Sequence, residues 1–242
     1  MRRVIEYNLK APKLSRSVTL LLLGDLHNEP WEDLLPLLEG PQALLIVGDL
    51  GNRYKNQWKR SLDFLQVAAQ RLPVFVSVGN HDLALTDFEA YADGVRVTGA
   101  RLLCDGFEPF GEMAIGGYYQ PPKESPAYAL QVSREKNPLS GFSARREYRI
   151  LLCHRPEQAV ALPESLADLI LCGHAHGGQI RVLGHGLYAP GQGVLPRYTH
   201  GLYLGRILVT SGAGNPVGMP RWGNPREAVR LVLEGESPGK TP

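Results

Sequence analysis

Five short apolar runs in this chain are each followed at once by side chains that bind metals. The runs are VTLLLL, ALLIV, VFVSV, RILLC and LILC, and the side chains after them come from Asp25 and His27, Asp49, Asn80, His154, and His174 and His176. Short continuous apolar runs bounded by turn residues are typical of fully buried strands. A glycine, which lets the chain turn sharply, follows four of the runs. The pattern predicts ligands at the carboxyl ends of strands, along one edge of a buried sheet, where open α/β sheets bind ligands.

Helical periodicity separates the first three runs. A helix is predicted near 57–71, where one face carries apolar residues at Trp58, Leu62, Leu65 and Ala69. A second helix is predicted near 31–39. Strands that alternate with helices indicate βαβ units. We predict a single α/β domain over residues 1–235, followed by a disordered tail over 236–242.

Length, charge and hydropathy exclude several broad classes of protein. The 242 residues carry a net charge of only +2, which leaves no electrostatic footprint for nucleic acid. No stretch approaches the roughly 18 apolar residues that cross a bilayer. The basic amino terminus has no apolar segment before Val18, so it does not resemble an export signal. We expect a cytoplasmic protein without a dedicated nucleic-acid partner, while peripheral membrane contact stays open.

The three cysteines form no disulfide framework, and their odd number fits a reducing compartment. Cys153 and Cys172 each end an apolar run beside a candidate ligand, so a thiolate ligand has to be considered. Free cysteine inside a strand behaves as a small hydrophobic residue. We therefore interpret both as packing residues.

The candidate ligands are too numerous for one metal ion. The seven are Asp25, His27, Asp49, Asn80, His154, His174 and His176. Asp25 and His27, like His174 and His176, are two residues apart, so each pair would point to one side of an extended strand end. Imidazole and carboxylate ligands suit manganese, iron or zinc, and two ions about 4 Å apart make a clamp for phosphoryl chemistry. Because only the two aspartates are ionised, two divalent ions would keep a positive surplus that attracts phosphate.

These residues resemble the calcineurin-like metallophosphoesterases. The blocks that match, in the order of the family, are Gly24-Asp25-Leu26-His27, Gly48-Asp49-Leu50-Gly51-Asn52-Arg53, Gly79-Asn80-His81-Asp82, His154 and Gly173-His174-Ala175-His176. The resemblance implies a four-layer α/β/β/α sandwich with a dinuclear metal site at the carboxyl ends of the strands. It also implies two divalent ions, with Mn²⁺ expected and Fe or Zn as alternatives. Asp49 would bridge them; Asp25, His27 and His176 would complete one site, and Asn80, His154 and His174 the other.

The same resemblance implies three catalytic side chains. His81 would face the substrate and protonate the leaving oxygen or stabilise the transition state, Asp82 would orient His81, and Arg53 would approach the phosphate or fix its loop. One position departs from the family pattern, because Asn52 stands where an aspartate usually orients a site histidine. Loss of such a carboxylate can cost roughly 10–100-fold in metal affinity or activity. Since asparagine still accepts a hydrogen bond, we expect a tuned site that remains active.

The carboxyl-terminal part resembles a bacterial branch of the family that includes phosphodiesterases of the cell envelope. This resemblance rests on His176-Gly177-Gly178-Gln179-Ile180 and Arg221-Trp222-Gly223-Asn224-Pro225. The sequence thus predicts a metal-dependent hydrolase of small phosphate esters that uses a metal-bridging hydroxide. A phosphodiester or pyrophosphate substrate is favoured. The alternatives are a broad-range phosphomonoesterase and a non-catalytic metal-binding scaffold.

Overall fold

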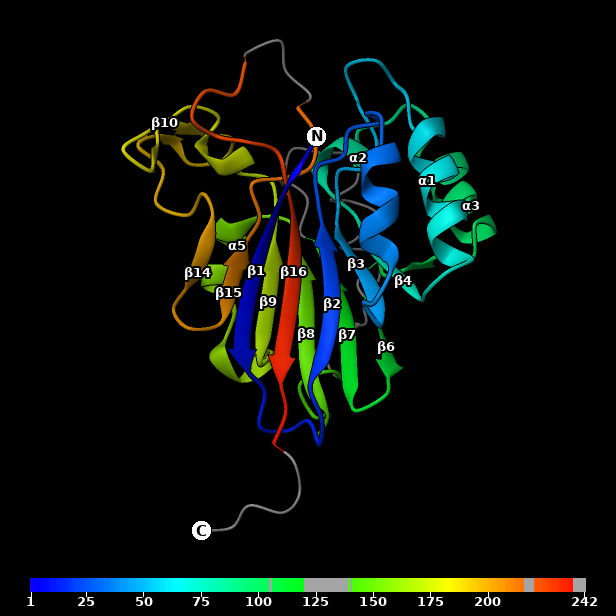
Figure 1. Cartoon of the computed structure of the whole chain (residues 1–242). Helices are drawn as coiled ribbons and strands as arrows, with labels where there is room; N and C mark the ends of the chain where they lie inside the picture. Colours follow the sequence, from blue (N-terminus) through cyan, green and yellow to red (C-terminus); the bar gives the residue numbers. More distant parts are fainter. Residues whose placement is uncertain (105, 120–138, 140, 216–219, 237–242) are drawn as a thin grey trace.

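Two six-stranded sheets pack face to face in the computed structural model, which describes residues 1–104, 106–119, 139, 141–215 and 220–236 (Figure 1). The first sheet has the order β1 (Arg3–Lys10), β16 (Glu227–Glu234), β2 (Val18–Leu23), β3 (Ala43–Val47), β4 (Val74–Ser77), β5 (Arg101–Leu102). The second has the order β14 (Gly201–Tyr203), β15 (Ile207–Val209), β9 (Leu169–Cys172), β8 (Tyr148–Cys153), β7 (Met113–Tyr118), β6 (Phe107–Phe110). Two short hairpins join β10 (Arg181–Val182) to β11 (His185–Gly186), and β12 (Tyr188–Ala189) to β13 (Gly193–Val194).

The apolar runs form strands that are buried on both faces. In β2, Leu20 and Leu22 belong to the core between the two sheets, whereas Leu21 and Leu23 belong to the core under the outer helices. Successive side chains of a strand point to opposite faces, so a strand between two apolar layers needs an unbroken apolar run. This explains why the runs show no alternation with polar residues.

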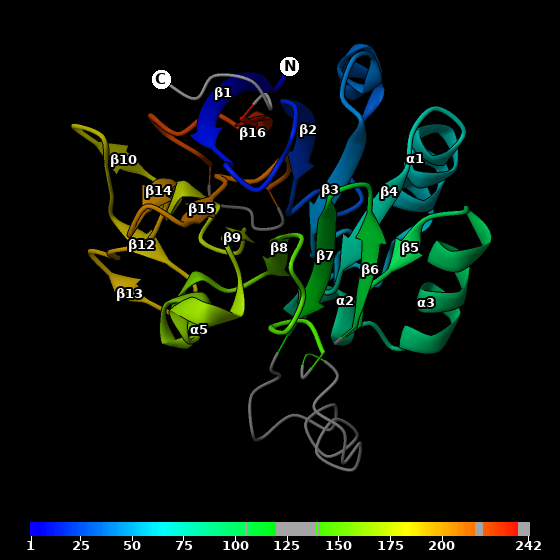
Figure 2. The same cartoon turned by 90° about the horizontal axis from the view of Figure 1, so that it is seen from below.

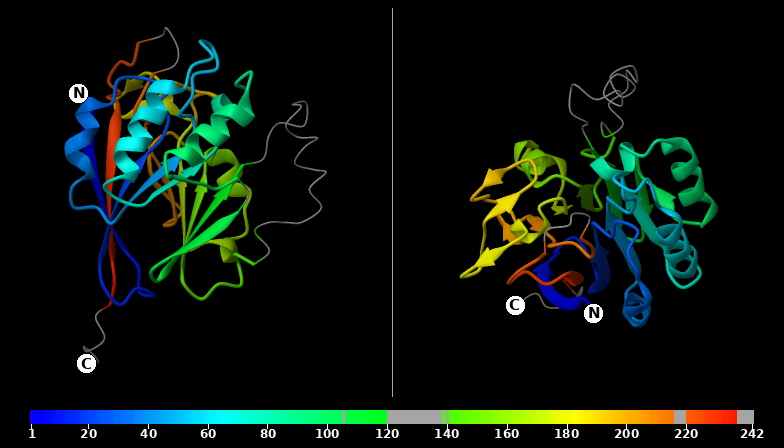
Figure 3. Two further views of the ribbon diagram at one scale, coloured as in Figure 1. Left: turned by 90° about the vertical axis from the view of Figure 1, so that its right-hand side faces the viewer. Right: turned by 90° about the horizontal axis from the view of Figure 1, so that it is seen from above.

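Helices cover the outer face of each sheet. On the first sheet lie α1 (Lys59–Ala69), α3 (Phe88–Val97) and the 3₁₀ helix η1 (Glu32–Leu38), which Figure 3 shows in a row. On the second sheet lies α5 (Pro156–Ala161), on the opposite side of the molecule (Figure 2). The remaining short helices are α2 (Asn80–Leu83), η2 (Glu164–Leu166) and η3 (His176–Gly178). These layers confirm the predicted four-layer α/β/β/α sandwich.

The prediction that all ligand-bearing strands belong to one sheet is wrong. β2, β3 and β4 are parallel neighbours in the first sheet, whereas β8 and β9 are parallel neighbours in the second. Every run has the same buried pattern, so the pattern alone does not distinguish the sheet to which a strand belongs. The carboxyl ends of these strands, from both sheets, instead meet at one end of the sandwich.

Several smaller predictions can be compared with the structure. The helix near 57–71 is α1, with Leu65 buried and Leu62 packed beside it. The helix near 31–39 is the 3₁₀ helix η1, which contains Pro36, a residue without the N–H that an α-helix interior requires. Cys153 and Cys172 are fully buried at strand ends, consistent with packing. Apart from Glu236, the predicted tail lies outside the described residues.

The amino-terminal strand was not predicted from the sequence. β1 pairs in parallel with β16 from Arg3 to Lys10, so segments from both ends of the chain complete the first sheet. Among the residues that the structure describes, no helix has the length and apolar character to cross a membrane. The single-domain boundaries and the cytoplasmic location stay predictions.

Asp168 ties the two sheets together at the end opposite the ligands. Its carboxylate accepts hydrogen bonds from Lys13 Nζ at 2.9 Å, before β2, and from the Arg149 backbone N–H at 2.8 Å and Nε at 3.2 Å, in β8. Partial burial would raise the pKa of Asp168, but the bonds from Arg149 and Lys13 outweigh it and hold that pKa below its ordinary value.

We expect Asp168→Asn to lower the free energy of unfolding by about 1 kcal/mol at pH 7, since the carboxylate is partly screened by solvent. A depressed pKa stabilises the folded state above the unfolded value of about 4, so the difference from wild type should shrink below that pH and vanish once pH falls through the lower pKa of folded Asp168. Urea unfolding at pH 7 and pH 3 measures it. A pH-independent difference would contradict the assignment.

Candidate metal centre

The ligand pairs lie in tight turns just beyond the strand ends. The φ angle is +54° at Asp25, +53° at His27, +67° at His174 and +46° at His176, and +56° at Asp49. The prediction of extended pairs is therefore wrong. Left-handed angles cost non-glycine residues about 1–3 kcal/mol each and persist where the surrounding structure holds them, typically at functional sites.

Two of the four glycines that follow the runs leave room for a carboxylate. Of Gly24, Gly48, Gly79 and Gly173, only Gly48 has a positive φ, of +88°. A Cβ at Gly173 would lie 2.7 Å from Asp25 Oδ2, and a Cβ at Gly79 would overlap Asp49 Oδ1. The backbone of these loops thus lies directly against the ligand side chains.

The first ligand set consists of Asp25, His27 and His176, whose donor atoms all lie within 4.8 Å of one another. The two histidine Nε2 atoms are 3.4 Å apart, and His176 Nε2 is 3.7 Å from Asp25 Oδ1. The Nδ1 atom of His27 lies 3.2 Å from the carbonyl oxygen of Gly51. Donation to that oxygen places the ring proton on Nδ1 and leaves Nε2 free to bind a metal.

Two residues of the carboxyl-terminal motif position His176. Arg221 Nη2 lies 2.8 Å from Nδ1 of His176 and also donates to the carbonyl oxygen of Gly214 at 2.6 Å. Asn224 Nδ2 donates to the carbonyl oxygen of His176 at 2.6 Å. Sequence reasoning gave neither residue a role in the site, although both belong to the motif that pointed to the bacterial branch.

The second ligand set consists of Asp49, His154 and His174, again with donors within 4.8 Å of one another. His154 Nδ1 donates to the carbonyl oxygen of Val47 at 2.6 Å, which directs Nε2 to within 3.2 Å of Asp49 Oδ2. Asp49 Oδ2 also lies 3.9 Å from His27 Nε2, in the first set. Asp49 therefore lies between the two sets.

The donor atoms of the second set fit a cation. The three donor atoms of this set, Asp49 Oδ2, His154 Nε2 and His174 Nε2, are buried, and so is the nearby Asn80 Oδ1. Apart from the 3.2 Å contact between Asp49 Oδ2 and His154 Nε2, none of the four has a partner among the described residues. Leaving such groups unsatisfied costs about 1–3 kcal/mol each. A divalent cation is a partner that all four donor atoms can share.

Burial also sets the protonation of the site. It lowers the pKa of His27 to about 3, and it lowers the pKa values of His174 and His176 well below the ordinary histidine value. These three imidazoles are therefore neutral at pH 7, the form that binds metals. Burial raises the pKa of Asp25 to about 7. It also opposes charge on His154, but the adjacent Asp49 carboxylate outweighs that effect and raises the pKa of His154 to about 9.

His81 lies beside the first set, with its ring centroid 4.5 Å from that of His27 and only 5% of its surface exposed. The Arg53 backbone N–H donates to His81 Nδ1 at 3.4 Å, so the neutral ring carries its proton on Nε2. The donors of His27, Asp49 and His81 also lie within 4.8 Å of one another, so His81 itself has the spacing of a ligand.

Asp82 holds the loops of the site together. Its carboxylate accepts hydrogen bonds from the backbone N–H groups of Asp49 at 2.7 Å, Gly51 at 2.8 Å and Gly79 at 2.9 Å. The His81 backbone N–H in turn donates to Asp49 Oδ1 at 2.7 Å. These bonds connect the turn after β3 to the turn after β4. The bonds of the Asp82 carboxylate thus position His81 through the backbone.

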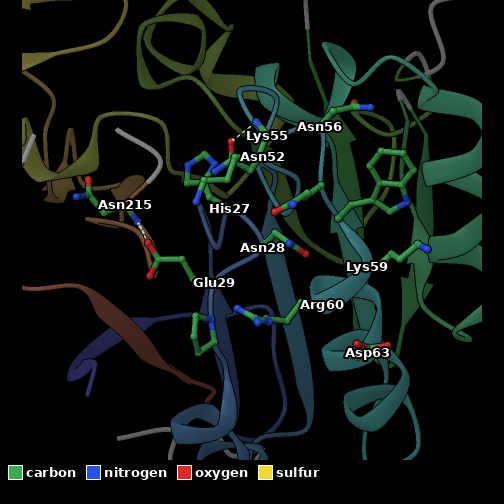
Figure 4. A pocket seen from close by; sticks show the side chains of 13 residues that line it. His27, Asn28, Glu29, Asn52, Lys55, Asn56, Lys59, Arg60, Asp63 and Asn215 are labelled. Carbon is green, nitrogen blue, oxygen red and sulfur yellow. Dashed lines mark hydrogen bonds between the residues drawn. The ribbon is translucent and has the colours of Figure 1, made fainter. Parts of the chain in front are cut away.

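Two hollows adjoin the ligands. A cavity of about 170 Å³ lies over Asp49, Asn80, His81 and both carboxyl-terminal ligand histidines, with the exposed Arg53 at its mouth. A cleft of about 770 Å³ begins at His27 and Asn52 and runs along the start of α1. Figure 4 shows His27 and Asn52 at one end of this cleft, Glu29 and Asn215 on one side, and Lys59, Arg60 and Asp63 of α1 on the other.

Asn52 caps its own loop, since its Oδ1 accepts the backbone N–H groups of Tyr54 at 3.1 Å and Lys55 at 3.3 Å. An aspartate keeps an acceptor in that place, so we expect Asn52→Asp to have an equal or higher kcat/KM. Asn52→Leu removes the acceptor and should lower kcat/KM. Steady-state kinetics on a phosphate diester measures both. A large loss of activity in Asn52→Asp would contradict this account.

A four-layer sandwich with two ligand sets around a shared aspartate is the arrangement of a metal-dependent phosphoester hydrolase. The family model for calcineurin-like phosphoesterase matches residues 18–178, a span that contains both ligand sets. The chain belongs to this family, whose members use a dinuclear metal centre.

Curated relatives agree with the family. The chain is 29% identical over 242 residues to an uncharacterized metallophosphoesterase of Campylobacter jejuni, covering 95% of this chain and 62% of that protein. It is 26% identical over 227 residues to phosphodiesterase YaeI of Escherichia coli, covering 83% and 76%. It is 24% identical over 201 residues to a transmembrane protein with metallophosphoesterase domain of Danio rerio, covering 74% and 45%. The chain thus spans less than two thirds of the Campylobacter and Danio proteins.

Proposed function

We propose that this protein hydrolyses a phosphodiester or a pyrophosphate at a centre of two divalent cations, with Mn²⁺ as the preferred ion. The observation that carries the proposal is the pair of adjoining ligand sets around Asp49, with four buried donor atoms that have no hydrogen-bond partner outside the site among the described residues. When bound, two such ions lower the pKa of water towards 7 and stabilise the charge on phosphate oxygens.

The ligands divide between the two ions as the two sets do. Asp25, His27 and His176 would hold one cation, and Asn80, His154 and His174 the other, with Asp49 shared. The supporting geometry is the 3.2 Å and 3.9 Å approach of Asp49 Oδ2 to a histidine Nε2 of each set.

The other side chains act on the substrate or on the loops. His81, with its proton on Nε2, would donate to the leaving oxygen as the ester bond breaks. Arg53 at the mouth of the small cavity would pair with a phosphate oxygen. Asp82 would hold the turns after β3 and β4 so that His81 keeps its position beside Asp49.

The large cleft favours a phosphate that carries a second substituent. It opens directly beside His27, so a group attached to phosphorus at the ligands would extend into it. Lys55, Lys59 and Arg60 line it together with Glu29 and Asp63, and none of the three cations forms an ion pair within 4 Å among the described residues. These cations would favour an anionic or polar substituent. The name of the Escherichia coli relative, a phosphodiesterase, agrees with this preference.

The test compares bis(4-nitrophenyl) phosphate with 4-nitrophenyl phosphate in the presence of Mn²⁺. We expect kcat/KM for the diester to exceed that for the monoester by about tenfold or more, a transition-state difference of about 1.4 kcal/mol. Faster hydrolysis of the monoester would support the alternative, a broad-range phosphomonoesterase. The absence of hydrolysis of either ester would overturn the proposal.

A further inference from the structure

The carboxylate of Glu157 is buried beside the second ligand set. Glu157 lies in the first turn of α5, three residues after the ligand His154. Both of its carboxylate oxygens are buried, and neither forms a hydrogen bond with a described residue. Its Oε1 lies 3.9 Å from Nε2 of His174, which is one of the partnerless donor atoms. Burying a carboxylate without hydrogen bonds is costly, so this arrangement calls for a partner.

The loop between β12 and β13 closes over this carboxylate and the ring of His174. At Gly191, where φ is +75°, a Cβ would overlap Glu157 Oε1 and lie 3.3 Å from His174 Nε2. The hairpin of β12 and β13 contributes Tyr188 and Pro190 to the lining of the cavity over the ligands. The Glu157 carboxylate and the Nε2 atom of His174 therefore lie side by side beneath this loop, at the edge of the metal centre.

An ion pair with Arg155 does not explain why the Glu157 carboxylate is buried. The closest approach is 4.0 Å, from Arg155 Nη1 to Glu157 Oε1, and the Nε atom of Arg155 is itself buried without a hydrogen bond. In a strong ion pair the two atoms would lie about 2.7–2.9 Å apart, the usual distance of a charge-assisted hydrogen bond. The unsatisfied oxygens of Glu157 instead resemble the unsatisfied donors of Asp49, His154 and His174.

We propose that Glu157 is an eighth metal-binding side chain, supplying a carboxylate oxygen to the second cation beside His174. The inference rests on the proposed two-metal centre and deepens it. With Glu157, each cation has two carboxylates: Asp25 and Asp49 for the first, and Asp49 and Glu157 for the second. The additional oxygen ligand also favours a hard ion such as Mn²⁺ over ions that prefer nitrogen and sulfur.

The test is calorimetric titration of Mn²⁺ into chelator-stripped protein. Wild type should bind two ions per chain. Glu157→Gln should keep one site unchanged and weaken the other by about 10–100-fold, the range seen when a carboxylate that supports a metal site is removed. Glu157→Asp, one methylene shorter, should recover part of the affinity. Glu164→Gln changes an exposed glutamate close by and serves as the matched control, with both sites unchanged.

Thermal unfolding in EDTA distinguishes metal binding from a structural role. Without metal, Glu157→Gln should be at least as stable as wild type, because it removes a buried charge that lacks a hydrogen bond. Two Mn²⁺ sites of unchanged affinity in Glu157→Gln would overturn the role of Glu157 and leave the proposed function intact. A wild-type protein that binds no Mn²⁺ would overturn the proposed function, and this inference with it.

Discussion

Asp49→Asn should lower phosphodiester hydrolysis by about 10³-fold or more, since shared metal coordination contributes several kcal/mol to catalysis. Asp49 is 1% exposed, and its Oδ2 approaches Nε2 of His154 in one ligand set and of His27 in the other. Asparagine keeps the shape of the side chain, and its amide oxygen still accepts the His81 backbone N–H. It lacks the negative charge that two adjacent cations require. Both metal affinity and kcat should therefore fall.

Metal content after dialysis and kcat on bis(4-nitrophenyl) phosphate measure the effect of Asp49→Asn. Asp93→Asn is the matched control, because Asp93 is an exposed carboxylate of α3 that pairs with Arg96 at 2.7 Å. An Asp49→Asn protein that keeps two ions and more than about a tenth of wild-type activity would show that this carboxylate is not shared between the cations.

His81→Asn should lower kcat by about 10²–10⁴-fold, the usual contribution of a general acid, while both Mn²⁺ sites keep their affinity. His81 lies beside the first ligand set, and the Arg53 backbone N–H directs its proton to Nε2. The loss should depend on the leaving group. A nitrophenolate departs without a proton, whereas an alkoxide needs one, so the variant should lose more activity on an alkyl ester.

Kinetics on an aryl and an alkyl phosphodiester, together with a Mn²⁺ titration, measure the effect of His81→Asn. His185→Asn is the control, because His185 is exposed in the hairpin of β10 and β11. Loss of one Mn²⁺ site in His81→Asn would mean that His81 is a ligand, as its spacing to His27 and Asp49 permits. An equal loss on both esters would contradict proton donation.

The strands and the candidate ligands could be predicted from the sequence because both are local features. A run such as ALLIV is apolar at every position because it is buried on both faces, and Asp49 follows it by two residues. The division of the strands between two sheets could not be predicted in this way. It depends on pairings such as β2 with β16, where Leu22 lies opposite Val229 from the other end of the chain.

The supporting residues of the site were missed for a related reason. Arg221 and Asn224 contact His176 across more than 40 residues of sequence, and only the fold brings them together. The left-handed turns at Asp25 and His174 could not be predicted either, because aspartate and histidine adopt positive φ angles more often than most residues but do not require them. Glu157 has a weaker local signal, because it lies three residues after His154, inside a short helix and not directly at a strand end.

The two-metal centre is tested most directly by titrating Mn²⁺ into chelator-stripped protein while hydrolysis of bis(4-nitrophenyl) phosphate is followed. The seven ligand residues predict that activity rises until about two ions are bound per chain, because both sets must be filled for catalysis. Activity that reaches its maximum at one equivalent, or that persists without any metal, would contradict the account.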